Sequence, residues 1–569
     1  MSDSELRQRQ PSPATPAKAP PNKQKRSSVP PLSNQLPAAF ATRGFTLAAS
    51  LALSIILLLY LRNFHSSSLA TSYILCSPPG TQQIYTVDHG DSKVECMVIH
   101  GDFIIDTGAR ADLTDRRSSY KLIHIKPGAI VVPGLTDSHL HALEYGAQRQ
   151  IPMEDARNAL EAVAHVSNYI KADPTIYHNI SYFVEGWGWD HTKWPAEQWP
   201  TTEEMESDPV IRGRPVVLQS KDGHALWVSQ WILDAMAPIP AYVEGGHIVR
   251  DETGNPTGVF LDNAQDLVPR PPPTEKQLLK RWSIMVKDAH AVGLTSVHDA
   301  GFSPISLKFF ERQAMNDNLP LRVYGMRYFN EDGPYWGNIS AKIIAAGNDR
   351  LTSRSVKIFG DGALRSGGAA LYEPYSDNPE TRGFMRLSTE VLNEIIPNFL
   401  RDGWQVNIHA IGDRANAIIL DAFENALKDT NVTALRPRLE HAQIMTNRDM
   451  TRLGKLGVIA SVQPTHAISD MWYAESRLGP ERVKGLYAFR SIIDAGARIT
   501  LGSDAPVEDI NPLAGFYAAI TRVSPDEGSP HGPGGWFPEQ RISRKEALRG
   551  ETTLSRPLNL FFERGIADT

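Results

Sequence analysis

The chain has 569 residues, 41% of them hydrophobic and 21% charged, so it can bury a large core and is expected to hold more than one domain. Its formal net charge of -6 provides no basic footprint for nucleic acid, which argues against a nucleic-acid partner. The two cysteines can form at most one bridge, which excludes a disulfide-built scaffold.

The N-terminal region predicts a membrane anchor. Residues 1–44 are rich in Pro, Ser, Lys, Arg and Gln and are expected to form a disordered basic tail in the cytosol. Residues 45–62 are apolar and uncharged up to Leu61, which predicts a transmembrane signal anchor; a cleaved signal peptide is the alternative. Lys and Arg are concentrated before this stretch, and the positive-inside rule then gives a single-pass type II membrane protein with a lumenal or extracellular catalytic domain.

Three Asn-x-Ser/Thr glycosylation acceptors, at Asn179, Asn338 and Asn431, fit a glycoprotein in that compartment. A Ser-rich stem is expected over residues 63–81. Short β-like runs between residues 82 and 133 predict the N-terminal part of a small β-sandwich.

From residue 134 to residue 540, apolar strands alternate with helical stretches, which is typical of a parallel α/β fold. The predicted core strands are Ile130–Leu135, Thr295–His298, Leu321–Tyr328, Ser355–Phe359, Gln405–Ile408, Arg438–Glu440, Ile459–Gln463 and Arg498–Leu501. The predicted helices include Thr274–Ala291, Thr389–Arg401, Asn416–Lys428 and Asn447–Leu456. Eight strand–helix units predict a (β/α)8 TIM barrel, with an insertion at its mouth over about residues 150–290.

Polar side chains fall at the ends of five of these strands. Residues two apart on a strand point the same way, so His139 and His141 are expected to aim at one point. Imidazole is a common ligand of zinc and similar ions, although a histidine pair can also be two polar residues of a turn. The full set that barrel geometry brings to one rim is His139, His141, Lys357, His409, His441 and Asp504.

These motifs resemble those of the amidohydrolase superfamily and, within it, of amidohydrolase family 3, the YtcJ-like metal-dependent hydrolases. The resemblance covers roughly residues 82–547 and is carried by Pro133–His141, Lys357–Leu364, His409–Ala415, Arg438–Ala442 and Gly502–Ala505. It implies an α/β fold in which a TIM barrel is joined by a small β-sandwich built from both flanking segments. Residues 541–569 depart from the family pattern, so this C-terminal segment is expected to be atypical or truncated.

The resemblance also implies a metal centre with one or two divalent ions, zinc being the expected metal. The implied ligands are His139, His141, Lys357, His409, His441 and Asp504. In binuclear family members the lysine that Lys357 matches is carbamylated and bridges two metals; a salt bridge at the barrel rim is the alternative role for Lys357.

The chemistry that these residues suit is hydrolysis of a non-peptide carbon–nitrogen bond, in an amide or an N-acyl or formamide group of a small-molecule substrate, by metal-activated water. Asp504 is the expected proton acceptor and donor, and His224 is expected to hydrogen-bond the carbonyl oxygen. Candidate substrate-binding residues are Asp222, His224, Asp361, Arg365 and Trp189, each of which has an alternative role in ordering a loop or filling the core. Ester or lactone hydrolysis on the same scaffold stays open, as does a catalytically inactive, membrane-anchored metal-binding or scaffold glycoprotein.

Overall fold

The computed structural model describes residues 72–88, 90–101, 103–195, 198–330 and 333–552. The predicted anchor at residues 45–62 and residues 63–71 of the predicted stem lie outside these ranges. No helix in the described part of the chain combines the length and the apolar composition that crossing a bilayer requires. The chain divides into the units Met1–Tyr73 and Ile74–Thr569, and the elements below belong to the second, apart from the first two residues of β1.

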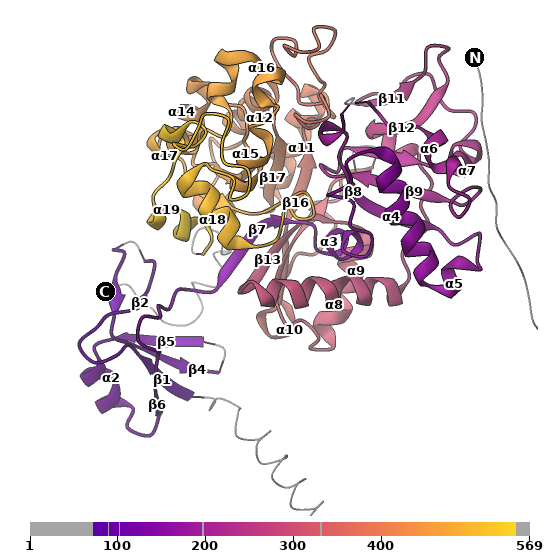
Figure 1. Cartoon of the computed structure of the whole chain (residues 1–569). Coiled ribbons are helices and arrows are strands. Elements are labelled where there is room, and N and C mark those ends of the chain that lie inside the picture. The colour runs from indigo at the N-terminus through magenta and orange to yellow at the C-terminus, as the bar shows by residue number, and fades with distance from the viewer. Residues whose placement is uncertain (1–71, 89, 102, 196–197, 331–332, 553–569) are drawn as a thin grey trace, which may run out of the picture. The chain divides into compact units, whose positions relative to one another are not determined.

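Eight parallel strands form the central sheet, in which each strand pairs with the next along the chain (Figure 1). They are β7 (Leu135–Leu140), β13 (Leu294–Phe302), β14 (Arg322–Tyr328), β16 (Leu351–Phe359), β17 (Gln405–Ala410), β18 (Arg438–His441), β19 (Ile459–Val462) and β20 (Ile499–Leu501), and the short β15 (Ile343–Ala345) is added antiparallel to β16. The first and last strands are joined just beyond their paired ends, where the Asp504 N–H donates to the His139 carbonyl and the His141 N–H to the Ala505 carbonyl, both at 2.7 Å. The result is a nearly closed barrel, which confirms the predicted parallel α/β architecture.

The first strand differs from the prediction of Ile130–Leu135. It begins at Leu135 and ends at Leu140, so His139 lies within the strand instead of after it. Pro133 has no N–H for a sheet ladder and Gly134 is a poor strand residue, which explains why the strand begins beyond them.

Helices surround the strands, and several were predicted closely. The helices α8 (Glu275–Ala291), α11 (Thr389–Arg401) and α14 (Asn447–Leu456) are capped by the side chains of Thr274, Ser388 and Thr446, each of which accepts a backbone N–H of the first turn. Helix α12 (Asp413–Ala426) begins three residues before its predicted start. The other helices of the barrel region are α3 (Ala142–Gln148), α9 (Pro304–Met315), α10 (Ala346–Asp349), α13 (Val432–Leu435), α15 (Pro464–Asp470), α16 (Ala474–Arg482), α17 (Phe489–Asp494), α18 (Pro512–Thr521) and α19 (Arg544–Gly550), with 3-10 turns at Val483–Gly485 and Pro538–Gln540.

The insertion between β7 and β13 contains its own five-stranded sheet, in the order β11-β12-β10-β9-β8. These strands are β8 (Val184–Trp189), β9 (Val216–Ser220), β10 (Ala225–Val228), β11 (Gly246–Arg250) and β12 (Pro256–Asp262). The helices α4 (Ala159–Ala172), α5 (Pro174–Tyr177), α6 (Thr202–Ser207) and α7 (Gln230–Ala235), with 3-10 turns at His191–Lys193 and Asn263–Leu267, complete it. The ends of β9, β10 and β12 carry the residues that this insertion contributes to the site.

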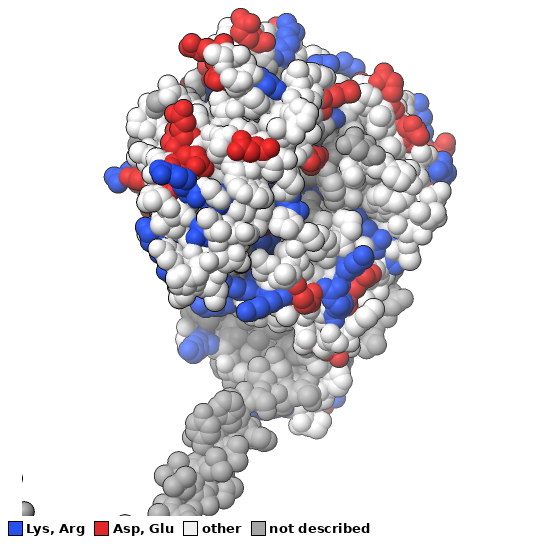
Figure 2. Space-filling model, turned by 90° about the vertical axis from the view of Figure 1, so that its right-hand side faces the viewer, with Lys and Arg blue, Asp and Glu red and all other residues white. Residues whose placement is uncertain are grey.

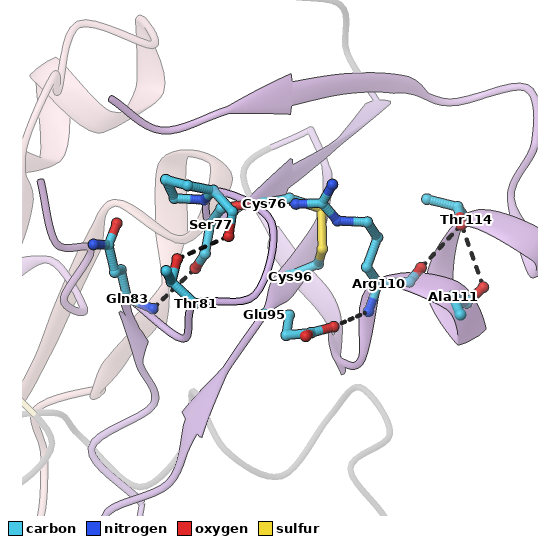
Figure 3. Close-up of a disulfide and its surroundings, with 10 residues drawn as sticks. Cys76, Ser77, Thr81, Gln83, Glu95, Cys96, Arg110, Ala111 and Thr114 are labelled. Carbon is cyan, nitrogen blue, oxygen red and sulfur yellow. Dashed lines mark hydrogen bonds between the residues drawn. A yellow bond between two sulfur atoms is a disulfide. The ribbon is translucent and has the colours of Figure 1, made fainter. Parts of the chain in front are cut away.

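The small β unit is a four-stranded sheet in the order β5-β4-β1-β6, with a separate ribbon of β2 and β3. The strands are β1 (Ser72–Cys76), β2 (Ile84–Tyr85), β3 (Lys93–Val94), β4 (Cys96–His100), β5 (Phe103–Gly108) and β6 (Lys121–His124), and α2 (Arg110–Arg116) packs Leu113 against the sheet. A disulfide joins Cys76 to Cys96 at the buried centre (Figure 3). The sheet therefore begins within the predicted stem, at Ser72.

The predicted β-sandwich with strands from both flanking segments stays a prediction, because residues 553–569 of the C-terminal segment lie outside the described residues. In the described ranges, residues 541–552 supply the helix α19 and no strand. The physical reason is local: Ser543 and Glu546 form a capping box, in which each side chain accepts the other residue's backbone N–H, and this arrangement starts a helix.

The surface is mixed in charge. Figure 2 shows a face on which basic and acidic side chains are interspersed among uncharged ones. The mixture of charges on this face agrees with the small net charge.

Candidate metal centre and active site

Two histidines of the first strand region converge on one carboxylate. His139 is fully buried within β7, and its Nε2 lies 3.3 Å from Oδ1 of Asp504. His141 directly follows the strand, and its Nε2 lies 3.3 Å from the same oxygen. The period-two geometry of the strand therefore brings both imidazoles to Asp504, as the His-x-His spacing predicts.

Two further histidines come from neighbouring strands. His409 on β17 and His441 at the end of β18 have ring centroids 4.5 Å apart, and the rings of His441 and His139 are separated by 4.8 Å. His441 and Asp504 both have positive φ values, 73° and 59°, which non-glycine residues rarely adopt. Such backbone strain is concentrated at functional sites, where the surrounding structure stabilises it.

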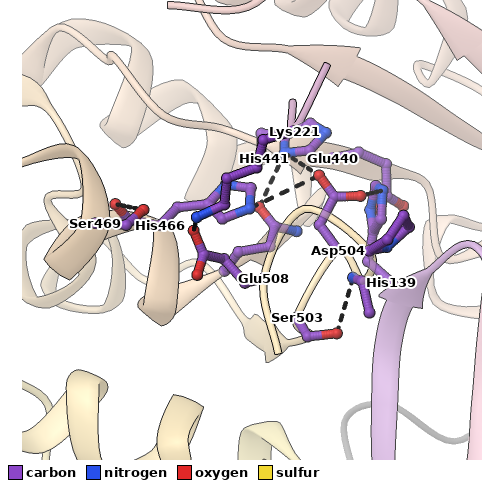
Figure 4. Close-up of polar contacts among 12 residues, drawn as sticks. His139, Lys221, Glu440, His441, His466, Ser469, Ser503, Asp504 and Glu508 are labelled. Atoms are coloured by element: carbon purple, nitrogen blue, oxygen red, sulfur yellow. Dashed lines mark hydrogen bonds and ion pairs between the residues drawn. The ribbon is translucent and has the colours of Figure 1, made fainter. Parts of the chain in front are cut away.

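Asp504 is held at this point by the loop after β20. Asp137, two residues before His139, accepts hydrogen bonds from the Ser503 hydroxyl at 2.6 Å and from the His139 N–H at 3.0 Å, which ties the two strand ends together. Figure 4 shows Asp504 beside His139. Burial raises the pKa of Asp504, but the imidazoles of His139 and His141 outweigh burial and hold it well below its ordinary value. Asp504 is therefore an ionised carboxylate in the middle of the histidines.

Lys357, on β16, is fully buried, and its Nζ has no hydrogen-bond partner among the described residues. The amine lies 4.3 Å from the centroid of the Phe359 ring. Burial lowers the pKa of Lys357 to about 8, while the charges of Glu440 and Asp504 oppose this shift. No salt bridge at the barrel rim, the alternative role for this lysine, is present in the described structure around it.

Each of three imidazoles is oriented by a hydrogen bond at Nδ1. The partners are Glu440 for His139 at 2.6 Å, Asp361 for His409 at 3.1 Å and Gln463 for His441 at 2.9 Å. Contacts of this kind fix the tautomer and the ring orientation of metal-binding histidines. Arg438 contacts Glu440, and although burial raises the pKa of Glu440, this contact and His139 hold it far below its ordinary value.

Asp361, a predicted substrate-binding residue, is surrounded by hydrogen-bond donors of the protein. Its carboxylate is fully buried and accepts hydrogen bonds from His409 and from the backbone N–H groups of Ala370, Ile411 and Gly412. These four donors occupy both oxygens, so Asp361 orients His409 and shapes the loop after β16.

Trp189 and Arg365 also have structural partners. The Trp189 indole donates to the Leu218 carbonyl at 2.9 Å inside the core of the insertion. The Arg365 guanidinium bridges Asp190 at 2.8 Å and Asp470 at 2.9 Å. Both side chains line a small hollow together with Asp222, and their own polar groups are paired with protein atoms.

His224 lies beside His409, and the centroids of the two rings are 5.3 Å apart. Its Nδ1 is 2.5 Å from Oδ1 of Asp262, a residue with φ of 50° at the end of β12. Burial lowers the pKa of His224, but the Asp262 carboxylate outweighs burial and raises it above its ordinary value. The nearby Asp222 accepts from the His224 N–H at 3.1 Å and from the Ser220 hydroxyl, so Asp222 orders the turn that carries His224.

The residues that sequence reasoning missed are Asp137, Asp262, Glu440, Arg438 and Gln463, each of which holds a predicted site residue in place. Four of them could be found from their spacing, since Asp137, Arg438 and Glu440 lie within three residues of a predicted ligand and Gln463 ends a predicted strand. Asp262 had no such signal, because it lies 38 residues beyond His224 on a different strand.

The donor set fits a divalent cation. His139, His441 and Asp504 each offer a ligand atom, and these atoms lie within 4.8 Å of one another. Nε2 of His139, Nε2 of His409 and Oδ1 of Asp504 are buried with no hydrogen-bond partner among the described residues. Burying polar atoms without partners is costly, so a group of nitrogen and oxygen donors in this state is suited to a metal ion such as zinc.

The comparisons with known proteins agree with this geometry. The family model described as "Amidohydrolase family" matches residues 127–555. The putative amidohydrolase YtcJ of Bacillus subtilis (strain 168) is 29% identical over 459 residues, which cover 78% of this chain and 83% of YtcJ. The N-substituted formamide deformylase of Arthrobacter pascens is 26% identical over 488 residues, which cover 82% of this chain and 86% of the deformylase. An uncharacterized metal-dependent hydrolase from Pyrococcus horikoshii OT3 matches in fold, with a TM-score of 0.65 and 24% identity, covering 86% of this chain and 93% of that one.

A nearly closed parallel barrel with histidines, a lysine and an aspartate at its strand ends defines the class of metal-dependent hydrolases. The chain belongs to the amidohydrolase family, whose model matches most of its length. It is accordingly an enzyme of the group that hydrolyses carbon–nitrogen bonds.

Proposed function

We propose that this enzyme hydrolyses a non-peptide amide, N-acyl or formamide bond of a small molecule with water activated at a zinc centre. The observation that carries the proposal is the convergence of His139 and His141 on one oxygen of Asp504, each at 3.3 Å, inside a buried site. The relationship to an N-substituted formamide deformylase supports the choice of bond.

The proposed ligands are the six predicted residues, His139, His141, Lys357, His409, His441 and Asp504. A divalent cation bound there would polarise the substrate carbonyl and ease the deprotonation of water at neutral pH. The buried Lys357 amine, unpartnered in the described structure and with a pKa of about 8, is suited to act as a ligand either unprotonated or carbamylated.

Asp504 is the proposed proton carrier. Its carboxylate is ionised in the site and can accept a proton from the attacking water at Oδ. The same carboxyl group then returns the proton to the leaving nitrogen, which is a poor leaving group until it is protonated. The short hydrogen bonds through Asp137 and Ser503 keep this oxygen in place during both transfers.

His224 is the proposed second catalytic residue. Asp262 fixes the ring through Nδ1, so Nε2 is the nitrogen left to donate to the substrate carbonyl oxygen as negative charge develops there. A preorganised donor of this kind accelerates acyl transfer because it needs no rearrangement during the reaction. Asp222 supports the turn that presents His224.

We also propose that the catalytic unit is lumenal or extracellular and N-glycosylated. Asn179, Asn338 and Asn431 are all exposed, which is compatible with attached glycans. The disulfide between Cys76 and Cys96 is typical of proteins in an oxidising compartment. The predicted type II anchor gives the same orientation.

The test is to measure zinc in the purified ectodomain and to assay the same sample against N-substituted formamides, N-acyl amines, esters and lactones. We expect bound zinc and release of amine, with activity lost on chelation and restored by zinc plus bicarbonate. Turnover of esters or lactones alone would reassign the substrate class. A folded protein that neither holds nor gains zinc would contradict the proposal and support the scaffold alternative.

A further inference from the structure

A buried ionic cluster lies inside the barrel beside the proposed metal ligands. It consists of Arg438 and Glu440 on β18, His298 on β13, Ser138 on β7 and Ser461 on β19, and every member is at most 4% exposed. We call this the inner cluster. TIM-barrel interiors are usually filled by branched apolar side chains, so a guanidinium at this place needs an explanation.

Arg438 holds both oxygens of Glu440. Its Nε lies 2.8 Å from Oε1, and its Nη2 donates to Oε2 at 3.0 Å. Oε2 also receives the Nδ1–H of His139 at 2.6 Å. Glu440 therefore occupies Nδ1 of His139 and leaves Nε2 of this ring for the metal site.

Arg438 also reaches the strand that carries His139. Its Nη2 donates to the Ser138 carbonyl at 2.8 Å, one residue before His139. The same guanidinium donates to the Ser461 hydroxyl and, at 3.2 Å, to Nδ1 of His298. Since a guanidinium has no acceptor, this last contact requires an unprotonated Nδ1 on His298, which fixes that ring as well.

We propose that Arg438 is a positioning residue of the metal centre, which fixes the orientation of His139 both through Glu440 and through the Ser138 carbonyl. The inner cluster thereby sets the affinity of the site for zinc. This inference rests on the metal centre proposed above, and it assigns Arg438 no contact with metal or substrate.

A purely stabilising role is the simpler alternative, but buried ion pairs are weak evidence for stability. Desolvation of two charges roughly cancels their attraction, and replacement by apolar residues is often neutral. What Arg438 supplies is direction: its planar guanidinium donates to Oε2 of Glu440 and to the Ser138 carbonyl, and a lysine ammonium lacks this fixed planar arrangement of donors. The distinction between the roles can be measured.

The test compares the zinc dissociation constants of the full-length wild-type protein and of its variants Arg438→Met, Arg438→Lys and Glu440→Gln, obtained by competition with a chromogenic chelator. We expect both Arg438 variants to bind zinc about 10- to 100-fold more weakly, as for other residues that orient metal ligands. Glu440→Gln keeps an oxygen for the His139 Nδ1–H but loses the ionic contact, so its affinity should also fall.

Arg490→Met is the matched control. Arg490 contacts both oxygens of Glu546, at 2.8 and 3.0 Å, outside the site, so this variant should change thermal stability and leave the zinc affinity unchanged. If Arg438→Met does not fold, Arg438→Lys and Glu440→Gln decide the question. Folded Arg438 variants with wild-type zinc affinity would overturn the inference alone, whereas a wild-type protein that binds no zinc would overturn the proposed function and the inference together.

Discussion

Replacing Asp504 with asparagine tests the proposed mechanism most directly. Asp504 is only 6% exposed, and asparagine has the same size, so the packing of the loop after β20 is retained. The amide cannot accept a proton from water, although its oxygen can still face the imidazoles of His139 and His141. The variant therefore separates proton transfer from the shape of the site.

General acid–base catalysis by one group contributes about 10²- to 10⁴-fold. Losing it in Asp504→Asn should lower kcat by that factor, which corresponds to about 3–5 kcal/mol in the activation free energy. A further loss is expected if the neutral side chain weakens metal binding, because Asp504 is also a proposed ligand.

The assay measures initial rates of amine release from an N-substituted formamide, with zinc content determined on the same sample. Asp509→Asn is the matched control, since Asp509 lies five residues further along and is exposed; it should keep the wild-type rate. The reasoning is refuted if Asp504→Asn with a full complement of zinc retains kcat within a factor of about ten of wild type.

Three further outcomes are expected. His224→Ala should lower kcat about 10²- to 10³-fold at unchanged zinc content, since it removes one donor to the developing oxyanion; loss of zinc in this variant would instead make His224 a ligand. Replacing Cys76 and Cys96 by alanine opens a loop with a sequence separation of 20 residues. The small β unit should lose about 3 kcal/mol of stability, measured by denaturation monitored by hydrogen exchange, while the activity changes little. The pKa of Asp190 is raised by burial, but Arg365 and other cations outweigh burial and lower it to about 2. The ionised carboxylate should therefore add about 2 kcal/mol to the free energy of unfolding above pH 4, and this contribution is lost as the pH falls towards 2. The melting temperature of Asp190→Asn should then fall less steeply than that of wild type between pH 5 and 2.5, and parallel curves would contradict this.

Local patterns predicted four helices of the barrel region and the order of its strands. The helices Thr389–Arg401 and Asn447–Leu456 begin and end where they were predicted. Both are specified by residues close together in the sequence, namely a serine or threonine cap and an apolar stripe. The first strand was placed too early, since its apolar run continues through Pro133 and Gly134 and only hydrogen bonding shows where pairing begins.

For the site, the sequence by itself predicted which side chains meet at the proposed metal centre. His139, His141, His409, His441, Lys357 and Asp504 stand at or near strand ends, and the parallel topology of a barrel brings such positions to one rim whatever their separation along the chain.

Only the tertiary structure decided what these groups contact. It paired Asp361 with His409, Asp262 with His224 and Arg438 with Glu440, and it placed Arg365 between the carboxylates of Asp190 and Asp470. The physical reason is that a hydrogen bond depends on distance and direction to within a fraction of an ångström. These quantities are set by how the strands and the insertion pack against one another, which no local pattern of residues records.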